Sequence, residues 1–177
     1  VRIGKDAIKS TTDIYRRIRN TFRFLLGALE GFSDEERVDL STPSELPELE
    51  QLVLHQLQQM DQSIRTDIKD YNFGKLAHKL HNFCSSELSA LYFDIRKDRL
   101  YCDRPDMFER RACRTVLAEI FECLTSWLAP MLCFTCEDVW AHRPEGLFPD
   151  AGSIHLREFK TLPQTWQNDD LAEKWDD

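Results

Sequence analysis

Apolar residues recur at intervals of three and four along most of the chain, which places them on one face of an α-helix. The pattern predicts a first helix over residues 10–29 and a second helix that begins near Pro47. A fourth helix opens at residues 103–105 and is stopped by Pro130, because an interior proline removes a backbone hydrogen bond. Between the second and fourth helices, a turn at 72–74 precedes a third helix. Its expected core positions are Leu76, Leu80, Phe83, Leu88, Leu91, Tyr92 and Ile95. Four long helices with short links predict an all-α fold, an up-down helical bundle.

After Pro130 the helical pattern shortens and then breaks. Residues 135–138 read TCED, which is close to a capping box and predicts a short fifth helix. Residues 153–159 alternate between apolar and polar side chains, as a short extended segment does, and the acidic residues 169–177 have the pattern of a further helix. We therefore expect a helical-bundle domain over residues 1–143 and a short irregular or extended appendage over residues 144–177.

Composition fits a soluble globular protein. The 177 residues are 42% hydrophobic and 31% charged, and only 6 glycines and 7 prolines argue against a loop-rich β fold. No apolar run approaches the roughly 20 residues that cross a bilayer, so we expect no membrane partner. The chain starts without Met and without the apolar core of a signal peptide, which indicates a piece of a longer protein.

The six cysteines do not have the pattern of a secreted disulfide framework. Cys133 and Cys136 form a lone C-x-x-C, with no second ligand pair for zinc and no βαβ pattern for redox chemistry. We therefore expect no metal site and a reducing, cytoplasmic location. Phosphate-loop, dinucleotide and nucleophile-elbow motifs are also missing, so no catalytic residue is predicted.

Charge is unevenly distributed in a chain whose formal net charge is -8. Residues 30–50 hold eight acids and one base, Arg37, and we interpret them as a solvated acidic loop. Residues 96–114 hold seven bases and four acids. A second basic segment lies in the first helix, where four arginines fall within residues 16–23.

The first helix places three of these arginines, Arg16, Arg19 and Arg23, with Asn20 on a face away from its apolar stripe. Two interpretations stay open. The row binds phosphate, for which the planar guanidinium fork is suited, or it pairs with acids of neighbouring helices. Under the first interpretation, Asn20 offers an amide to a base edge, and Phe24 or Tyr101 offers a ring to an unpaired base.

Several segments resemble the anticodon-binding domain of class I isoleucyl-tRNA synthetases of the bacterial type. The first is YRRIRNTFRFLLG at residues 15–27. HNFC at 81–84, the run 88–102 and LAPMLCFT at 128–135 follow in the family's order. KDRLYC at 97–102 favours isoleucyl over the valyl, leucyl or methionyl relatives, which share the bundle. Cys136 departs from the Ala or Ser usual in relatives, so the C-x-x-C is interpreted as a coincidence.

The resemblance implies a domain that binds the anticodon stem-loop of isoleucine tRNA, within a ligase that uses ATP and Mg²⁺. The HIGH and KMSKS-type catalytic signatures of the family are not in this chain. The resemblance therefore implies that catalysis lies in another domain, on which this one docks. It also implies that any zinc lies in a C-terminal module. It also implies a monomer. The expected RNA-facing residues are Arg16, Arg19, Asn20, Arg23, Phe24, Lys97, Arg99 and Tyr101. A helical protein-interaction or structural module remains the alternative.

Overall fold

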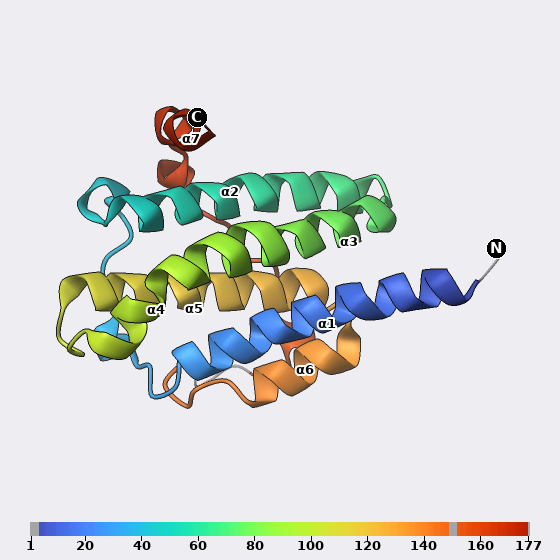
Figure 1. Ribbon diagram of the computed structural model, residues 1–177, viewed down its shortest axis with the longest axis horizontal. Coiled ribbons are helices and arrows are strands. Elements are labelled where there is room, and N and C mark those ends of the chain that lie inside the picture. The colour runs from blue at the N-terminus through green and yellow to red at the C-terminus, as the bar shows by residue number, and fades with distance from the viewer. Residues whose placement is uncertain (1–3, 149–151, 177) are drawn as a thin grey trace.

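The computed structural model describes residues 4–148 and 152–176 and contains helices and turns, with no strand in those two ranges. The all-α fold is therefore confirmed. In Figure 1, the chain reverses direction between successive long helices, and the orange α6 lies below the middle of the blue α1. Residues 1–3, 149–151 and 177, parts of the two predicted domains, lie outside the described residues.

The helices are α1 (Lys5–Ala28), α2 (Glu48–Lys69), α3 (Phe73–Asn82), α4 (Phe93–Cys102), α5 (Phe108–Leu128), α6 (Cys133–Ala141) and α7 (Asp169–Asp176). Short 3-10 turns span Asp34–Glu36, Pro43–Glu45, Ile154–Leu156 and Gln164–Trp166. The turn Ile154–Leu156 interrupts the extended segment that was expected over residues 153–159, while Ser153 and Arg157 on either side have extended backbones. The helix expected at the acidic end is present as α7.

A π-helical segment, Phe83–Tyr92, joins α3 to α4 in one continuous helix. Its i→i+5 hydrogen bonds put more residues in each turn than the 3.6 of an α-helix, so the buried face shifts along the sequence. The expected core position Ile95 is consequently 47% exposed, whereas Phe93 is 3% exposed. A strict 3.6-residue period misplaces the core side chains beyond this segment.

Helix α5 is the centre of the bundle. Its residues from Ala112 to Leu128 are all buried, because α1, α2, α4 and α6 pack around it. The indole Nε1 of Trp127 donates to the carboxylate of Asp61 on α2 at 3.3 Å, which satisfies the polar atom of this large buried ring. The predicted fourth helix is thus the core of the bundle.

Three predicted helix starts are wrong by a few residues. Helix α1 begins at Lys5 rather than at residue 10. Helix α5 begins at Phe108, because residues 103–107 form a turn instead of a first helical turn. Helix α6 begins at Cys133, and Glu137 does not cap it. The Glu137 carboxylate accepts hydrogen bonds from Ser153 Oγ at 2.7 Å and Ile154 N at 3.1 Å.

Residues 152–176 pack back across the bundle. The carbonyl of Gly152 accepts from Trp140 Nε1 at 2.7 Å, and Trp166 Nε1 donates to the carbonyl of Leu40 at 3.2 Å. Lys160 binds both Glu119 and Glu122 of α5, and Arg157 also binds Glu122. These two buried carboxylates are neutralised by the C-terminal segment, which is therefore a structural part of the bundle.

His55 on α2 holds this segment through a hydrogen bond that depends on its protonation state. Its buried Nδ1 accepts from the backbone N–H of Asn168 at 2.9 Å, so the ring is neutral with its proton on Nε2. Burial lowers the pKa of His55, and the nearby Asp169 charge opposes this only in part. A protonated ring would point an N–H at the Asn168 N–H and lose the bond.

We expect acid to weaken the fold through His55. Because the folded-state pKa is depressed, this stabilisation is present above the ordinary value of about 6.5 and is lost as the pH falls through the folded pKa. The loss cannot exceed about 1.4 kcal/mol per pH unit for one proton. Urea unfolding between pH 7.5 and 5 measures it. His55→Gln, whose amide oxygen also accepts, should show a shallower pH dependence, and equal slopes would contradict the assignment.

Candidate nucleic-acid interface

The orientation of α1 is set by its buried stripe. Ile18, Phe22 and Leu25 are buried in the core. Since residues three and four apart share a helix face, the row predicted from sequence is turned to solvent, and all four of its members are exposed: Arg16, Arg19, Asn20 and Arg23. The expectation that these side chains share one exposed face is confirmed.

The members of the row differ in their partners. Arg16 pairs with Asp13 one turn earlier at 3.1 Å, and both side chains are largely exposed. Arg19 and Arg23 make no ion pair or hydrogen bond with any residue in the part of the chain that the structure describes. Two adjacent turns of α1 thus present guanidinium groups without an internal carboxylate, as an anion-binding surface requires.

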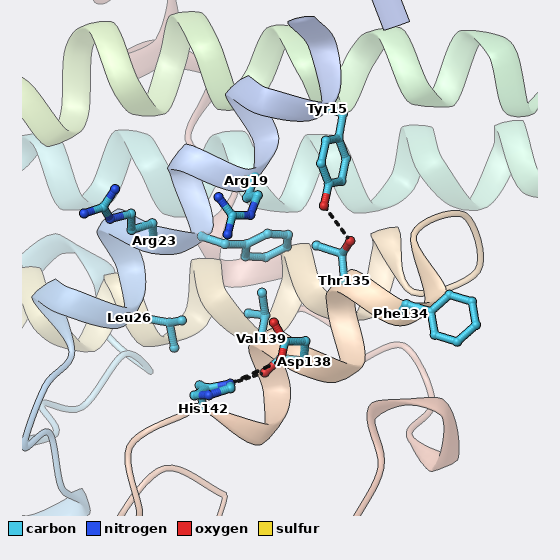
Figure 2. A pocket seen from close by; sticks show the side chains of 10 residues that line it. Tyr15, Arg19, Arg23, Leu26, Phe134, Thr135, Asp138, Val139 and His142 are labelled. Carbon is cyan, nitrogen blue, oxygen red and sulfur yellow. Dashed lines mark hydrogen bonds and ion pairs between the residues drawn. The ribbon is translucent and has the colours of Figure 1, made fainter. Parts of the chain in front are cut away.

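An open groove of about 520 Å³ runs between α1 and α6 beside these two arginines. Figure 2 shows Arg19 and Arg23 on the α1 side and Asp138 and His142 on the α6 side. The Tyr15 hydroxyl and Thr135 Oγ1 lie 3.1 Å apart and join the two helices at one end of the groove. The groove is therefore a defined hollow between two helices, bordered by the unpaired arginines.

Phe24 does not project freely from α1. Its ring stacks on Phe93 with centroids 4.1 Å apart and an interplanar angle of 15°. Phe24 is half-buried and packs against the core, so one face of its ring is already covered. At this position the structure provides a packing contact between α1 and the start of α4.

The basic segment 96–114 is largely used inside the protein. Arg114 pairs with Glu36 at 3.3 Å and donates to the carbonyl of Glu30, and Arg111 donates to backbone carbonyls of residues 35–37. Arg37 in turn reaches Glu119 of α5 at 3.4 Å. Two acids of the stretch 30–50, Glu36 and Glu50, pair with this basic segment, so the interpretation of residues 30–50 as a solvated loop is wrong for these two and holds for the other six acids, which are exposed.

The strongest of these internal pairs is Glu50 with Arg96. Both guanidinium nitrogens of the fork donate to the carboxylate, Nε to Oε1 at 2.7 Å and the terminal nitrogen to Oε2 at 2.6 Å. The Tyr92 hydroxyl adds a third donor to Oε1 at 3.2 Å. The Glu50 side chain is 0% exposed. Burial by itself would lower the pKa of Arg96, but the hydrogen bonds and charge of Glu50 outweigh it and raise that pKa.

The three remaining predicted residues lie on α4. Lys97 binds Asp94 at 2.6 Å and Arg99 binds Asp103 at 3.0 Å, both as pairs within one helical turn at the surface. Tyr101 is 72% exposed and its ring is open to solvent. Exposed pairs of this kind contribute little, so a phosphate can replace the acid at low cost. The structure places these residues apart from the groove.

Three residues that line the groove were missed from sequence: Phe134, Asp138 and His142. Phe134 is 93% exposed at the start of α6, an unusual position for a phenylalanine. The signal was present, since Val139 and Trp140 form the buried face of this short helix. A helical wheel of α6 anchored on those two residues puts Phe134 on the outside.

The two cysteines of the C-x-x-C face different environments. Cys136 is buried, which raises the pKa of its thiol to about 12, whereas Cys133 is exposed. Their thiols are therefore not presented together to a metal ion. Among residues 4–148 and 152–176, no cluster of three or more His, Cys, Asp or Glu side chains is arranged to hold one.

A helical bundle that presents unpaired guanidinium groups beside an open groove defines a helical module suited to a polyanion. Residues 50–176 match the family described as the anticodon-binding domain of tRNA ligase. The chain belongs to this family. Helix α1 precedes the matched range, but it is included in the similarity to the relatives described next.

The chain is similar to curated isoleucine–tRNA ligases over nearly its whole length. It is 49% identical over 180 residues to that of Zymomonas mobilis, which covers 99% of the chain and 18% of the relative. The ligase of Agrobacterium fabrum is 46% identical, with 99% and 17% covered. That of Caulobacter vibrioides is 47% identical, with 98% and 17% covered. The chain thus spans less than a fifth of the length of these relatives. In the described ranges, no helix is long and apolar enough to cross a membrane.

Proposed function

We propose that this chain is the anticodon-binding part of an isoleucine–tRNA ligase and that it grips the anticodon stem-loop of isoleucine tRNA. The observation that carries the proposal is the pair of exposed, unpaired arginines on α1, Arg19 and Arg23, in a domain of this family. Phosphate contacts dominate the affinity of such interfaces, and unpaired loop bases supply specificity. Asn20 between the two arginines offers both a donor and an acceptor to a base.

The wider assignment extends the proposal to a whole ligase, and it rests on the resemblance to isoleucyl-tRNA synthetases. Aminoacylation with ATP and Mg²⁺ belongs, in this proposal, to the remainder of a longer cytoplasmic ligase, which acts as a monomer and on whose catalytic domain this bundle docks. Any zinc is assigned to a C-terminal module of that ligase. The residues of this chain do no chemistry: they bind and orient the tRNA. Lys97 and Arg99 are secondary RNA contacts, available once Asp94 and Asp103 are displaced, and the exposed ring of Tyr101 is a further one.

A competition assay tests the specificity. Labelled isoleucine tRNA bound to the chain is displaced by unlabelled tRNAs that differ only in the anticodon, at one fixed salt concentration. We expect the unaltered tRNA to compete about tenfold better, the scale of one base contact. Valine, leucine and methionine tRNAs distinguish the related ligases. Equal competition by every tRNA would instead favour a protein-interaction or structural module.

A further inference from the structure

The groove between α1 and α6 combines an apolar floor with two polar borders. Phe22, Leu26 and Val139 contribute the apolar lining, and the arginines of α1 stand along one side. The opposite border is formed by Asp138 and His142. Its volume of about 520 Å³ falls in the roughly 300–1,000 Å³ typical of small-molecule sites. The hollow is therefore large enough for a ring system with a charged substituent.

The charge pattern selects the occupant. A ligand on an apolar floor next to two unpaired guanidinium groups satisfies both when it has a flat ring and an attached anion. One nucleotide of a single-stranded RNA segment has this composition, since its base stacks on apolar or aromatic side chains and its phosphate pairs with arginine. A protein segment would offer apolar side chains but would need a carboxylate for each arginine.

The α6 border can distinguish one base from another. His142 Nδ1 lies 2.8 Å from the backbone carbonyl of Asp138, so the neutral ring donates there and keeps Nε2 as an acceptor. The Asp138 carboxylate is a second acceptor 3.5 Å from Nδ1. Both side chains are at least 70% exposed. This border therefore favours the amino group of a base.

We propose that the α1–α6 groove seats one splayed nucleotide of the bound RNA, with its phosphate on Arg19 and Arg23 and its base on the apolar floor against Asp138 and His142. This inference rests on the proposed function and deepens it. It adds a pocket for one base beside the phosphate-binding arginines of α1. The exposed ring of Phe134, at the outer end of the groove, is a stacking surface for the neighbouring base.

The test fills the groove without removing charge. Leu26→Trp places a large ring over the floor, and Leu156→Trp, at an exposed leucine outside the groove, is the matched control. Binding is measured with the anticodon stem-loop of isoleucine tRNA and with copies in which one loop base at a time is removed to leave an abasic site. Leu26→Trp should weaken binding of the intact stem-loop about tenfold, the scale of one stacked base, with an unchanged salt slope.

One abasic position should weaken binding to the unmodified chain by the same factor and have no further effect on Leu26→Trp. If circular dichroism shows that Leu26→Trp is misfolded, the doubly substituted Asp138→Ala/His142→Ala chain replaces it, since both side chains are exposed. The groove assignment is overturned if Leu26→Trp binds the stem-loop with unchanged affinity. It is also overturned if every abasic position weakens binding to Leu26→Trp as much as it weakens binding to the unmodified chain. In both cases the proposed function stands as long as the arginine substitutions still weaken binding. If Arg19→Ala/Arg23→Ala also binds as the unmodified chain does, the proposed function itself fails, and the groove assignment with it.

Discussion

Replacement of Arg96 by Ala is expected to lower the free energy of unfolding by about 3–5 kcal/mol, the cost of leaving one partner of a buried ion pair uncompensated. Glu50 has no exposed side-chain surface, and two of its three hydrogen-bond donors come from Arg96. The remaining donor, the Tyr92 hydroxyl, cannot neutralise the carboxylate. A domain with a total stability of about 5–15 kcal/mol loses much of its margin through this single change.

Chemical denaturation with tryptophan fluorescence measures the loss. Arg104→Ala is the matched control, because Arg104 pairs with Asp106 at the surface with both side chains more than 70% exposed. That control should change stability by about 0–1 kcal/mol. Adding Glu50→Gln to Arg96→Ala removes the buried charge and should recover part of the stability. Equal effects of Arg96→Ala and Arg104→Ala would contradict the role of burial.

Removal of Arg19 and Arg23 together is expected to have the largest effect on RNA binding. Arg19→Ala/Arg23→Ala should weaken binding of isoleucine tRNA by about 10- to 100-fold, since each charge-assisted contact contributes about 1 kcal/mol or more. Binding of RNA releases counterions from each phosphate that an arginine contacts, and the variant makes fewer such contacts. The slope of log affinity against log salt should therefore become shallower by about 0.7–0.9 per arginine.

The fold should be unaffected by these substitutions, because both side chains are exposed and form no ion pair within the described residues. Lys69→Ala on α2, which lies on the far side of the bundle from α1 in Figure 1, removes one positive charge elsewhere and is the control for net charge. If Lys69→Ala and Arg23→Ala weaken RNA binding and reduce the salt slope equally, the effect is one of net charge alone and the prediction is contradicted.

The exposed face of α1 could be predicted because it depends only on local spacing. Ile18, Phe22 and Leu25 fix which side is buried, and the arginines follow from the helical period. That Arg19 and Arg23 lack acid partners could not be predicted, because pairing depends on which helices pack beside α1. The same limit hid the buried pair of Glu50 and Arg96, which lie 46 residues apart in the sequence.

The charge composition of a segment does not show whether its charged residues face solvent or pair with another part of the fold. Two ion pairs, Glu50 with Arg96 and Glu36 with Arg114, join the acidic stretch 30–50 to the basic segment 96–114. The groove was missed for a related reason: it arises from the packing of α6 against α1, two elements separated by about a hundred residues of chain. A hydrophobic pattern identifies each helix but not the hollow between two of them.

The C-terminal segment also imposes an order on folding. Helices that follow one another in the chain, such as α2 with α3 and α5 with α6, make contacts that are close in sequence, and such contacts form quickly. The bond from Trp166 to Leu40 joins residues 126 positions apart, and closing so long a loop carries a large entropic cost until the bundle holds both ends near each other. During synthesis, Glu122 lacks Arg157 and Lys160, and Glu119 has only Arg37, until the C-terminal segment leaves the ribosome, so the last ion pairs of the central helix α5 form only then.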